Sequence, residues 1–432
     1  MSDNKINRII AELIIILLAI NYMAVEIILK SNFVLSCLRD ILLASLLILT
    51  VRKIKVTISK PFYCVIIFMI LAALALYYTN SLATGIIAIR RYYFPILFLF
   101  CISNIDIDNN NHYIICFMVK LLALLSAWGI FQADILGDSF LRKIGYPLVY
   151  SYAYGRDMLY NSFYFGNLGI QRVVSTFSSS NIYGLCSGIV LIASIILYEY
   201  INIKCKNILI ILILAGYILS FSRSNFLALL VIFLVYLRKY IPHKKIVYFS
   251  ITVLIIALII WGIIQGNSGV LYKISTWIVN TFAGRESSSA ARSGIWKDAF
   301  MESVKHPLGL GYGHVGALAN SDLATSQVYS SENSYLTIAL DMGWLGTFLY
   351  IFFLASLVKI LIRYSIMFNN KSDYYGNRLC VCGYTILIYL SIVMLFSNHI
   401  QDMETICFAY LFAGIALQYI HTHNIKPINL ID

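Results

Sequence analysis

Runs of about twenty apolar residues recur along the whole chain, and this feature limits its fold more than any other. An α-helix needs about 20 residues to cross a hydrocarbon core of about 30 Å. Strands of a membrane barrel would instead alternate over roughly ten residues. Of the 432 residues, 60% are hydrophobic and 12% are charged, whereas about a quarter are charged in a soluble domain. We therefore expect an all-α, polytopic membrane helix bundle, with residues 1–432 forming one integral membrane domain.

The apolar runs predict about twelve transmembrane helices. The first run begins near Ile9 and continues without the short apolar core and cleavage site of a signal peptide, so we expect it to be retained as a span. The expected spans are 9–29, 33–51, 61–79, 92–104, 113–132, 179–198, 207–221, 225–237, 246–265, 334–358, 379–397 and 403–420.

Short basic loops all fall on one side when these spans alternate. Because cytoplasmic loops of membrane proteins are rich in Lys and Arg, that side is expected to be cytoplasmic, and both termini with it. Two long loops, 133–178 and 266–333, then emerge on the opposite face, where chemistry can be built in contact with water. The basic loops are those at 52–55, 204–206, 238–245 and 359–378.

Arginines are frequent in the outward-facing loops, although the charge rule disfavours them there. A guanidinium keeps its charge and offers a planar fork of donors that matches phosphate oxygens in pairs. The net charge of +12 could come from basic cytoplasmic loops alone, so only the positions of the arginines can indicate an anionic ligand. We therefore expect an anionic ligand at the outer membrane surface. The arginines are Arg142, Arg156, Arg172, Arg223, Arg285 and Arg292.

Two of these arginines stand beside the ends of expected helices. Arg223 lies at the tip of the hairpin LSFSRSNFLALL, where the alternative is an Arg that snorkels to the headgroups. Arg172 precedes the run SSSN, which can cap the next helix and add free N–H donors for an anion. The alternative for Arg172 is a solvated side chain beside an ordinary capped helix.

The second long loop contains an expected amphipathic helix at 290–304, with an apolar side that includes Trp296 and Phe300. We expect this helix to lie along the membrane surface. Pro307 ends it, and the glycines that follow allow tight turns. They do not form a phosphate-binding loop of the known kind, because no strand precedes them and no Lys-Ser/Thr follows.

Other residues have two interpretations. The many aromatic residues of the first long loop suit stacking on sugar faces or an interfacial aromatic belt. Charges within a span usually face a cavity or a partner, so Arg90 and Arg91 are expected to line the same outer cleft. Arg39 and Asp40 are expected to form a structural pair.

Four motifs together resemble the O-antigen polymerase and ligase superfamily of bacterial membrane enzymes. They are SRS at 222–224, R-x-x-x-W at 292–296, P-L-G-x-G at 307–311 and N-x-Y-L followed by G-x-x-G at 333–346. The resemblance implies a metal-independent glycosyltransferase of lipopolysaccharide biosynthesis in the bacterial inner membrane, without a cofactor. Its donor and acceptor would be undecaprenyl-diphosphate-linked oligosaccharides, joined at the periplasmic face, and the loop arginines would hold the diphosphate.

The resemblance also bears on individual residues. Ligases of this family generally place a His before the Asn of the last motif, where this chain has Glu332, so the resemblance favours an O-antigen polymerase. We expect Arg172, Arg223 and Arg292 to stabilise the leaving diphosphate and Glu332 to be the general base. The alternative for Glu332 is a carboxylate that only stabilises the start of a helix. Further residues expected to bind substrate are Arg285, Arg90, Arg91, His314, Asn333 and Tyr335.

Several alternatives stay open. His314 is the second candidate for the base and His399, near Asp402, the third. Asp341 matches an acidic position common in the family, and the alternative is that it only anchors its span against an Arg. An O-antigen ligase is the alternative enzyme, and a peptidoglycan-type polymerase is a more distant one. A flippase for lipid-linked oligosaccharide is the non-enzymatic alternative, but it should carry charge at the bundle midplane. The resemblance adds membrane lipids and a chain-length regulator as partners, and we expect no nucleic acid and no metal.

Overall fold

The computed structural model describes residues 3–28, 33–51, 60–79, 82–105, 112–146, 148–151, 156–159, 164–165, 170–236, 287–315 and 331–423. The expected span at 246–265 and Arg285 lie outside these residues. The described part of the chain is a helix bundle with four short strands. It therefore agrees with the expected fold class except for the strands.

Eleven of the expected spans correspond to helices. They are α1 (Asp3–Ile20), continued by η1 (Asn21–Ile28), α2 (Phe33–Val51), α3 (Lys60–Leu74), continued by η2 (Ala75–Tyr78), α4 (Leu82–Asn104), α5 (His112–Phe131), α7 (Ser180–Ile196), α8 (Lys206–Leu219), α9 (Arg223–Val235), α13 (Ser334–Asn370), α14 (Tyr374–Phe396) and α15 (Met403–Thr422).

Six helices within the described residues are long and apolar enough to cross a membrane. The shorter apolar helices include α7, α8 and α9. The chain is thus a multi-pass membrane protein, while the count of twelve spans remains a prediction. The six spans are Ile6–Met23, Leu82–Asn104, His112–Leu136, Ser334–Asn370, Tyr374–Phe396 and Met403–Thr422.

Two predicted boundaries differ from the structure by ten residues or more. Helix α4 begins at Leu82, ten residues before the expected span at 92–104, because the apolar residues there continue the helix on both sides of Arg90 and Arg91. Helix α13 continues to Asn370 and not to 358, so part of the expected basic loop is helical.

The first long loop holds the strands. After α5 come η3 (Gln132–Leu136) and α6 (Gly137–Ile144), and then two antiparallel pairs. Strand β1 (Leu148–Ser151) pairs with β2 (Arg156–Leu159), and β3 (Tyr164–Phe165) pairs with β4 (Ile170–Gln171). These elements lead the chain from α5 to the start of α7.

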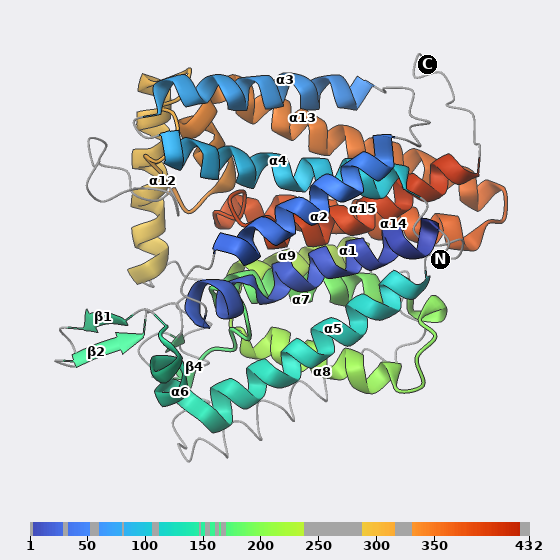
Figure 1. Ribbon diagram of the computed structural model, residues 1–432, viewed down its shortest axis with the longest axis horizontal. Coiled ribbons are helices and arrows are strands. Elements are labelled where there is room, and N and C mark those ends of the chain that lie inside the picture. The colour runs from blue at the N-terminus through green and yellow to red at the C-terminus, as the bar shows by residue number, and fades with distance from the viewer. Residues whose placement is uncertain are drawn as a thin grey trace.

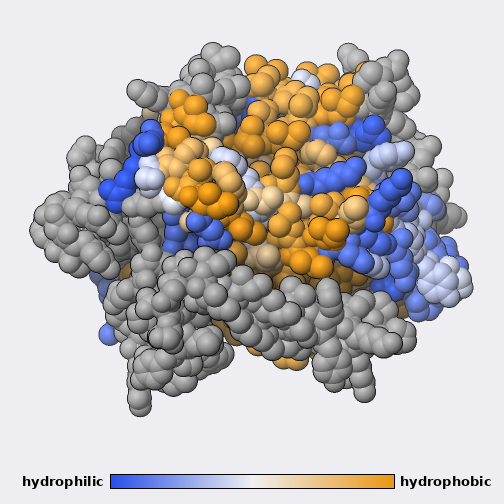
Figure 2. Space-filling model, turned by 90° about the horizontal axis from the view of Figure 1, so that it is seen from below, coloured by the Kyte–Doolittle hydropathy of each residue, from blue (hydrophilic) through white to orange (hydrophobic). Residues whose placement is uncertain are grey.

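The long helices run roughly along one direction, and one helix crosses their ends (Figure 1). This is α12 (Ser287–Lys305), which covers the helix expected at 290–304. It lies at the same end of the bundle as α6, β1 and β2, whereas α1 begins and α15 ends at the opposite end (Figure 1). In Figure 2 hydrophobic residues fill the middle of the described surface on one face, and hydrophilic residues lie towards the two ends. This distribution is typical of a membrane-embedded bundle.

The glycine-rich loop after α12 packs directly on a kink in α13. The kink lies at Gly343, which has φ 80° and ψ 173° inside the helix. The kink replaces the helical hydrogen bond between Trp344 N and the Leu340 carbonyl by two bonds to the loop. Leu310 N donates to the Leu340 carbonyl (2.6 Å), and Trp344 N donates to the Pro307 carbonyl (3.1 Å). Because a helix interior cannot leave these groups unpaired without cost, the loop and the kink depend on each other.

Candidate active site

An ion pair joins α12 to the start of α13. Arg292 Nε on α12 lies 2.5 Å from a carboxylate oxygen of Glu332, two residues before α13 begins. Trp296, one turn further along α12, donates from its indole nitrogen to the Glu332 carbonyl at 3.3 Å. Both side chains of the pair are about one third exposed, so the pair is accessible to a ligand from solvent.

Asn333, and not Glu332, caps α13. Its side-chain oxygen accepts hydrogen bonds from the backbone N–H groups of Tyr335 (2.9 Å) and Leu336 (3.1 Å). Its side-chain nitrogen donates to the Leu395 carbonyl on α14 at 2.9 Å. The capping role that was the alternative for Glu332 is therefore filled by its neighbour, and the Glu332 carboxylate points to Arg292.

Arg172 is held against the turn between α8 and α9. Its Nε donates to the Ser220 carbonyl at 2.8 Å, and its Nη2 donates to the Phe221 carbonyl at 3.2 Å. The same Nη2 donates to the side-chain oxygen of Asn181 at 2.9 Å. Asn181 lies in the first turn of α7, and Ser179 caps that helix by accepting from Ile182 N. The SSSN run thus both starts α7 and holds Arg172.

Electrostatic interactions place the four predicted catalytic residues in one cluster. Burial, together with the positive charges of Arg223 and Arg292, lowers the pKa of Arg172 to about 9. Arg223 interacts in turn with the charges of Arg292 and Glu332. At pH 7 Arg172 remains protonated, so three guanidiniums repel one another beside one carboxylate. An anionic ligand would relieve this repulsion.

Two residues in contact with this cluster have an unfavourable backbone conformation. Phe221 and Glu332 have φ values of 47° and 44°, in the left-handed region. A non-glycine residue in such a sparsely populated region costs about 1–3 kcal/mol, and such residues gather at functional sites. Phe221 accepts from Arg172, and Glu332 pairs with Arg292. The unusual backbone therefore lies where the charged side chains converge.

Two of the other expected substrate-binding residues, Tyr335 and Asn333, have hydrogen-bond partners within the protein. The Tyr335 hydroxyl donates to the Ser391 carbonyl on α14 at 3.2 Å. Both polar ends of the Asn333 amide are used for the cap and for Leu395. His314 is half-buried after the glycine turns, and burial together with the charge of His306 lowers its pKa. A lowered pKa keeps this imidazole neutral at pH 7, as a base requires.

Arg90 and Arg91 lie in α4, eight and nine residues after its first residue, Leu82. Arg90 Nε forms an ion pair with Asp40 at 2.9 Å. Arg39, which was expected to pair with Asp40, donates to the Asn21 side chain at 3.3 Å and lies over the ring of Phe94. The expected neighbour pair is thus replaced by a pair between α2 and α4, because residues one apart on a helix do not face each other.

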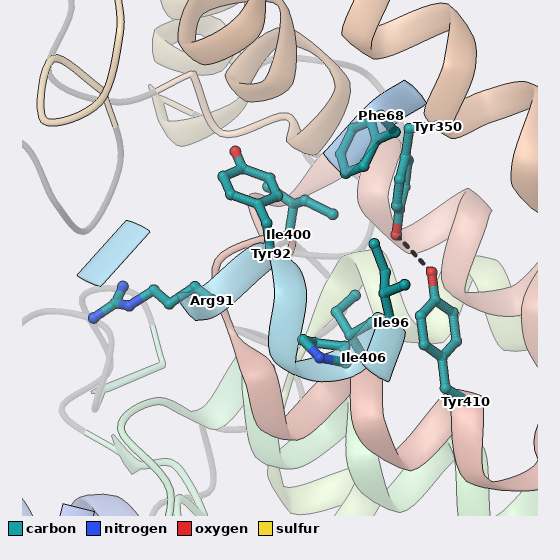
Figure 3. Close-up of a pocket in the computed structure, with 9 residues that line it drawn as sticks. Phe68, Arg91, Tyr92, Ile96, Tyr350, Ile400, Ile406 and Tyr410 are labelled. Carbon is teal, nitrogen blue, oxygen red and sulfur yellow. Dashed lines mark hydrogen bonds between the residues drawn. The ribbon is translucent and has the colours of Figure 1, made fainter. Parts of the chain in front are cut away.

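Arg91 borders a small pocket lined mainly by apolar and aromatic side chains. Tyr350 and Tyr410 bring their hydroxyls within 3.2 Å of each other there, and Arg91 extends away from these rings (Figure 3). Tyr92, beside it in the chain, donates to the buried Asp341 at 2.7 Å, as does Gln401 at 3.2 Å. The partners found for Asp341 are therefore a Tyr and a Gln, and not the Arg that the anchoring alternative predicted.

A buried His and carboxylate pair lies in the connection between α14 and α15. His399 Nδ1 is 2.9 Å from an Asp402 oxygen. The backbone N–H of His399 donates to the Ser334 hydroxyl at 2.9 Å, two residues from Glu332. Ser224, next to Arg223, lies 3.2 Å from Ser397 in the same connection. His399 is therefore close in the structure to the charged cluster.

Sequence reasoning missed the groups that hold the arginines. Asn181 gave a signal only as part of a capping run, and the carbonyls of Ser220 and Phe221 gave none, because backbone acceptors carry no residue signature. Among the described residues, no group of three or more His, Cys, Asp or Glu side chains is placed to hold a metal ion.

One family match covers part of this site. Residues 208–351 match the family model described as O-antigen ligase, consistent with the resemblance to the O-antigen polymerase and ligase superfamily. The matched segment contains Arg223, Arg292 and Glu332, while Arg172 precedes it. No curated protein matches the chain.

Proposed function

Because residues 208–351 carry the O-antigen ligase family region, we propose that this membrane protein is a glycosyltransferase that acts on a lipid-diphosphate-linked glycan. Within the superfamily, we propose an O-antigen polymerase that joins undecaprenyl-diphosphate-linked repeat units at the periplasmic face of the bacterial inner membrane. Undecaprenyl diphosphate is released in each transfer. The proposal places both termini in the cytoplasm, at the end of the bundle opposite α12.

The observation that supports the proposal most strongly is the convergence of Arg172, Arg223 and Arg292 from three separate segments beside Glu332. Guanidiniums bind phosphate oxygens in pairs and keep their charge in a partly dry site. Three of them suit the two phosphates of the donor, whose negative charge increases as the glycosyl bond breaks. Fixed donors of this kind stabilise a transition state more than a ground state.

The reaction then follows from the positions of these groups. The acceptor hydroxyl oxygen attacks the anomeric carbon, and the bond from that carbon to the diphosphate oxygen breaks with its electron pair going to the diphosphate. The hydroxyl proton passes to the Glu332 carboxylate. Since Glu332 is paired with Arg292 before substrate binds, a diphosphate that recruits Arg292 would release the carboxylate for this step. A single displacement of this kind inverts the anomeric centre.

Polymerisation is proposed over ligation because Glu332 precedes Asn333 where the ligases of the superfamily generally carry a His. Deletion of the gene in the native host distinguishes a polymerase, a ligase and a flippase by the surface polysaccharide that the cells then make. A single repeat unit on the lipid A core supports the polymerase, and free polymer without attachment supports the ligase. Repeat units that accumulate on the cytoplasmic side of the membrane would support the flippase.

Purified protein gives the direct test. Incubation with the lipid-linked repeat unit should produce longer lipid-linked glycans and one undecaprenyl diphosphate for each linkage made. The proposal is overturned if neither product forms with the natural repeat unit while the same preparation remains folded.

A further inference from the structure

Four residues of α12 lie on one side of the helix because they are spaced four apart: Arg292, Trp296, Phe300 and Val304. The first belongs to the cationic cluster, and the other three are apolar. Phe300 and Val304 are 48% and 54% exposed, although they are large and hydrophobic. An apolar strip about 12 Å long therefore begins one turn from Arg292 and follows α12 away from the charged cluster.

Ring contacts join this strip to the end of α14 and to α13. Trp296 contacts Phe396, the last residue of α14, with a centroid distance of 5.9 Å. Phe300 meets Trp344 edge to face at 5.9 Å, and Trp344 lies 6.0 Å from Phe348. The strip therefore passes without a break from the helix across the bundle end to a membrane span.

The part of α13 that follows is exposed and apolar. Leu345, Phe348 and Phe352 are 56%, 61% and 56% exposed. They belong to the span Ser334–Asn370, one of the six helices long enough to cross a membrane. Exposed apolar side chains of a span match lipid tails in polarity, so we expect the strip to run from the arginines at one end into the hydrocarbon layer at the other.

We propose that this strip, formed by Trp296, Phe300, Val304, Trp344, Leu345, Phe348 and Phe352, binds the polyprenyl chain of the lipid-linked donor. The inference rests on the proposed function and adds the path of the lipid to it. The diphosphate lies among Arg172, Arg223 and Arg292, and the chain leaves along α12 and down α13 into the bilayer. Because lipid tails are as apolar as these side chains, van der Waals packing of the strip against the chain, and not transfer out of water, supplies this part of the binding energy.

Two donors that differ only in the lipid test this inference. Both carry the same repeat unit and diphosphate, one on an undecaprenyl chain and one on a chain of two isoprene units. In protein reconstituted in nanodiscs, the double variant Phe300→Ser and Val304→Ser should raise the KM for the long-chain donor about tenfold, equivalent to about 1.4 kcal/mol. The KM for the short-chain donor should stay unchanged.

Helix α3 offers a matched control. Ile66 and Ile70 are exposed to similar extents, 46% and 54%, and Ile66→Ser with Ile70→Ser should change neither KM. An equal rise for both donors in the α12 variant, or no rise for the long-chain donor, overturns the inference and leaves only bilayer contact for the strip. Absence of transfer from both donors by the wild-type protein would instead count against the proposed function.

A second measurement does not depend on turnover. A long-chain donor with a photoreactive group near the middle of its prenyl chain should crosslink to peptides of α12 or of the first half of α13. Inorganic pyrophosphate should reduce this crosslinking, because it competes for the arginines. Crosslinking spread evenly over the exposed spans, including α3, would contradict a defined path.

Discussion

The Glu332 carboxylate lies 2.5 Å from Nε of Arg292, although forty positions separate the two residues in the chain. The pair joins the helix that crosses the end of the bundle to the start of the longest helix of the described part. It also places one negative group beside three positive ones, so a change on either side alters the charge balance of the whole cluster.

Glu332→Gln tests the carboxylate with little change in size. We expect the transfer rate to fall by about 10²–10⁴, the usual contribution of a general base, while donor binding is retained. The measurement is the rate for purified protein together with the polysaccharide ladder in cells. Glu302→Gln is the control, because the Glu302 carboxylate on the same helix contacts Lys305 and His306. An unchanged ladder would assign the base to His314 or His399.

Arg223→Gln tests the repulsion within the cluster. Removing one of three positive charges should raise the melting temperature in the absence of donor, since Arg172 and Arg292 then face less repulsion. The rate should nevertheless fall by about 10²–10³, as when one preorganised donor is lost. Arg223→Lys should also lose most activity, because an ammonium lacks the planar fork.

Stabilisation by inorganic pyrophosphate tests whether Arg223 belongs to an anion site. At a hundredfold excess over its Kd, a ligand stabilises the folded protein by about 2.7 kcal/mol. The melting temperature of the wild type should rise with pyrophosphate and that of Arg223→Gln should rise less. Arg363→Gln, in the C-terminal part of α13, should respond as the wild type does. An equal response of all three proteins would argue against an anion site at Arg223.

Asn333 variants separate helix capping from chemistry. Asn333→Ala removes the acceptor for Tyr335 N and Leu336 N and should cost about 1 kcal/mol of stability. Asn333→Ser restores a capping oxygen and should recover most of that loss. Thermal unfolding measures both. Full stability of Asn333→Ser with a complete loss of transfer would show instead that the amide contacts substrate.

Gly343→Ala tests the kink in α13. Gly343 has φ 80°, and an added Cβ would meet the backbone of Leu308 at 2.8 Å. We expect a loss of more than about 2 kcal/mol, because both the backbone conformation and the contact are unfavourable. Gly294→Ala on α12 is the control, since no atom lies within 4 Å of its added Cβ. There alanine should be neutral or stabilising by up to about 1 kcal/mol.

The sequence predicted the elements that follow from local pattern. Apolar length identified eleven of the helices, and polarity with period 3.6 identified α12. The arginines could be singled out because their placement contradicts the charge rule for outer loops. The charge rule alone indicates six arginines, and the family resemblance selects Arg172, Arg223 and Arg292 among them.

Contacts between distant segments could not be predicted in the same way. Two such contacts depend on how the helices pack. One is the ion pair between Asp40 and Arg90, and the other is the set of hydrogen bonds from Arg172 to the carbonyls of Ser220 and Phe221. The short strands have little apolar alternation, so their sequence does not predict strands and reads as an ordinary loop. The sequence could not show whether Glu332 caps α13 or leaves its carboxylate available for chemistry, since Asn333 and Glu332 are both acceptable at a helix start. The hydrogen bonds of Asn333 answer this question.

The exchange of hydrogen bonds at Gly343 has a mechanical consequence. Leu310 and Pro307 complete the backbone bonding of α13 from outside, so the end of α12 cannot shift without opening the helix whose first residues follow Glu332. Two sets of contacts therefore hold Arg292 and Glu332 at their separation. One is the ion pair itself, and the other is the pair of backbone hydrogen bonds between the glycine loop and α13. Substitutions in the glycine loop should then slow the proposed sugar transfer without changing either charged group.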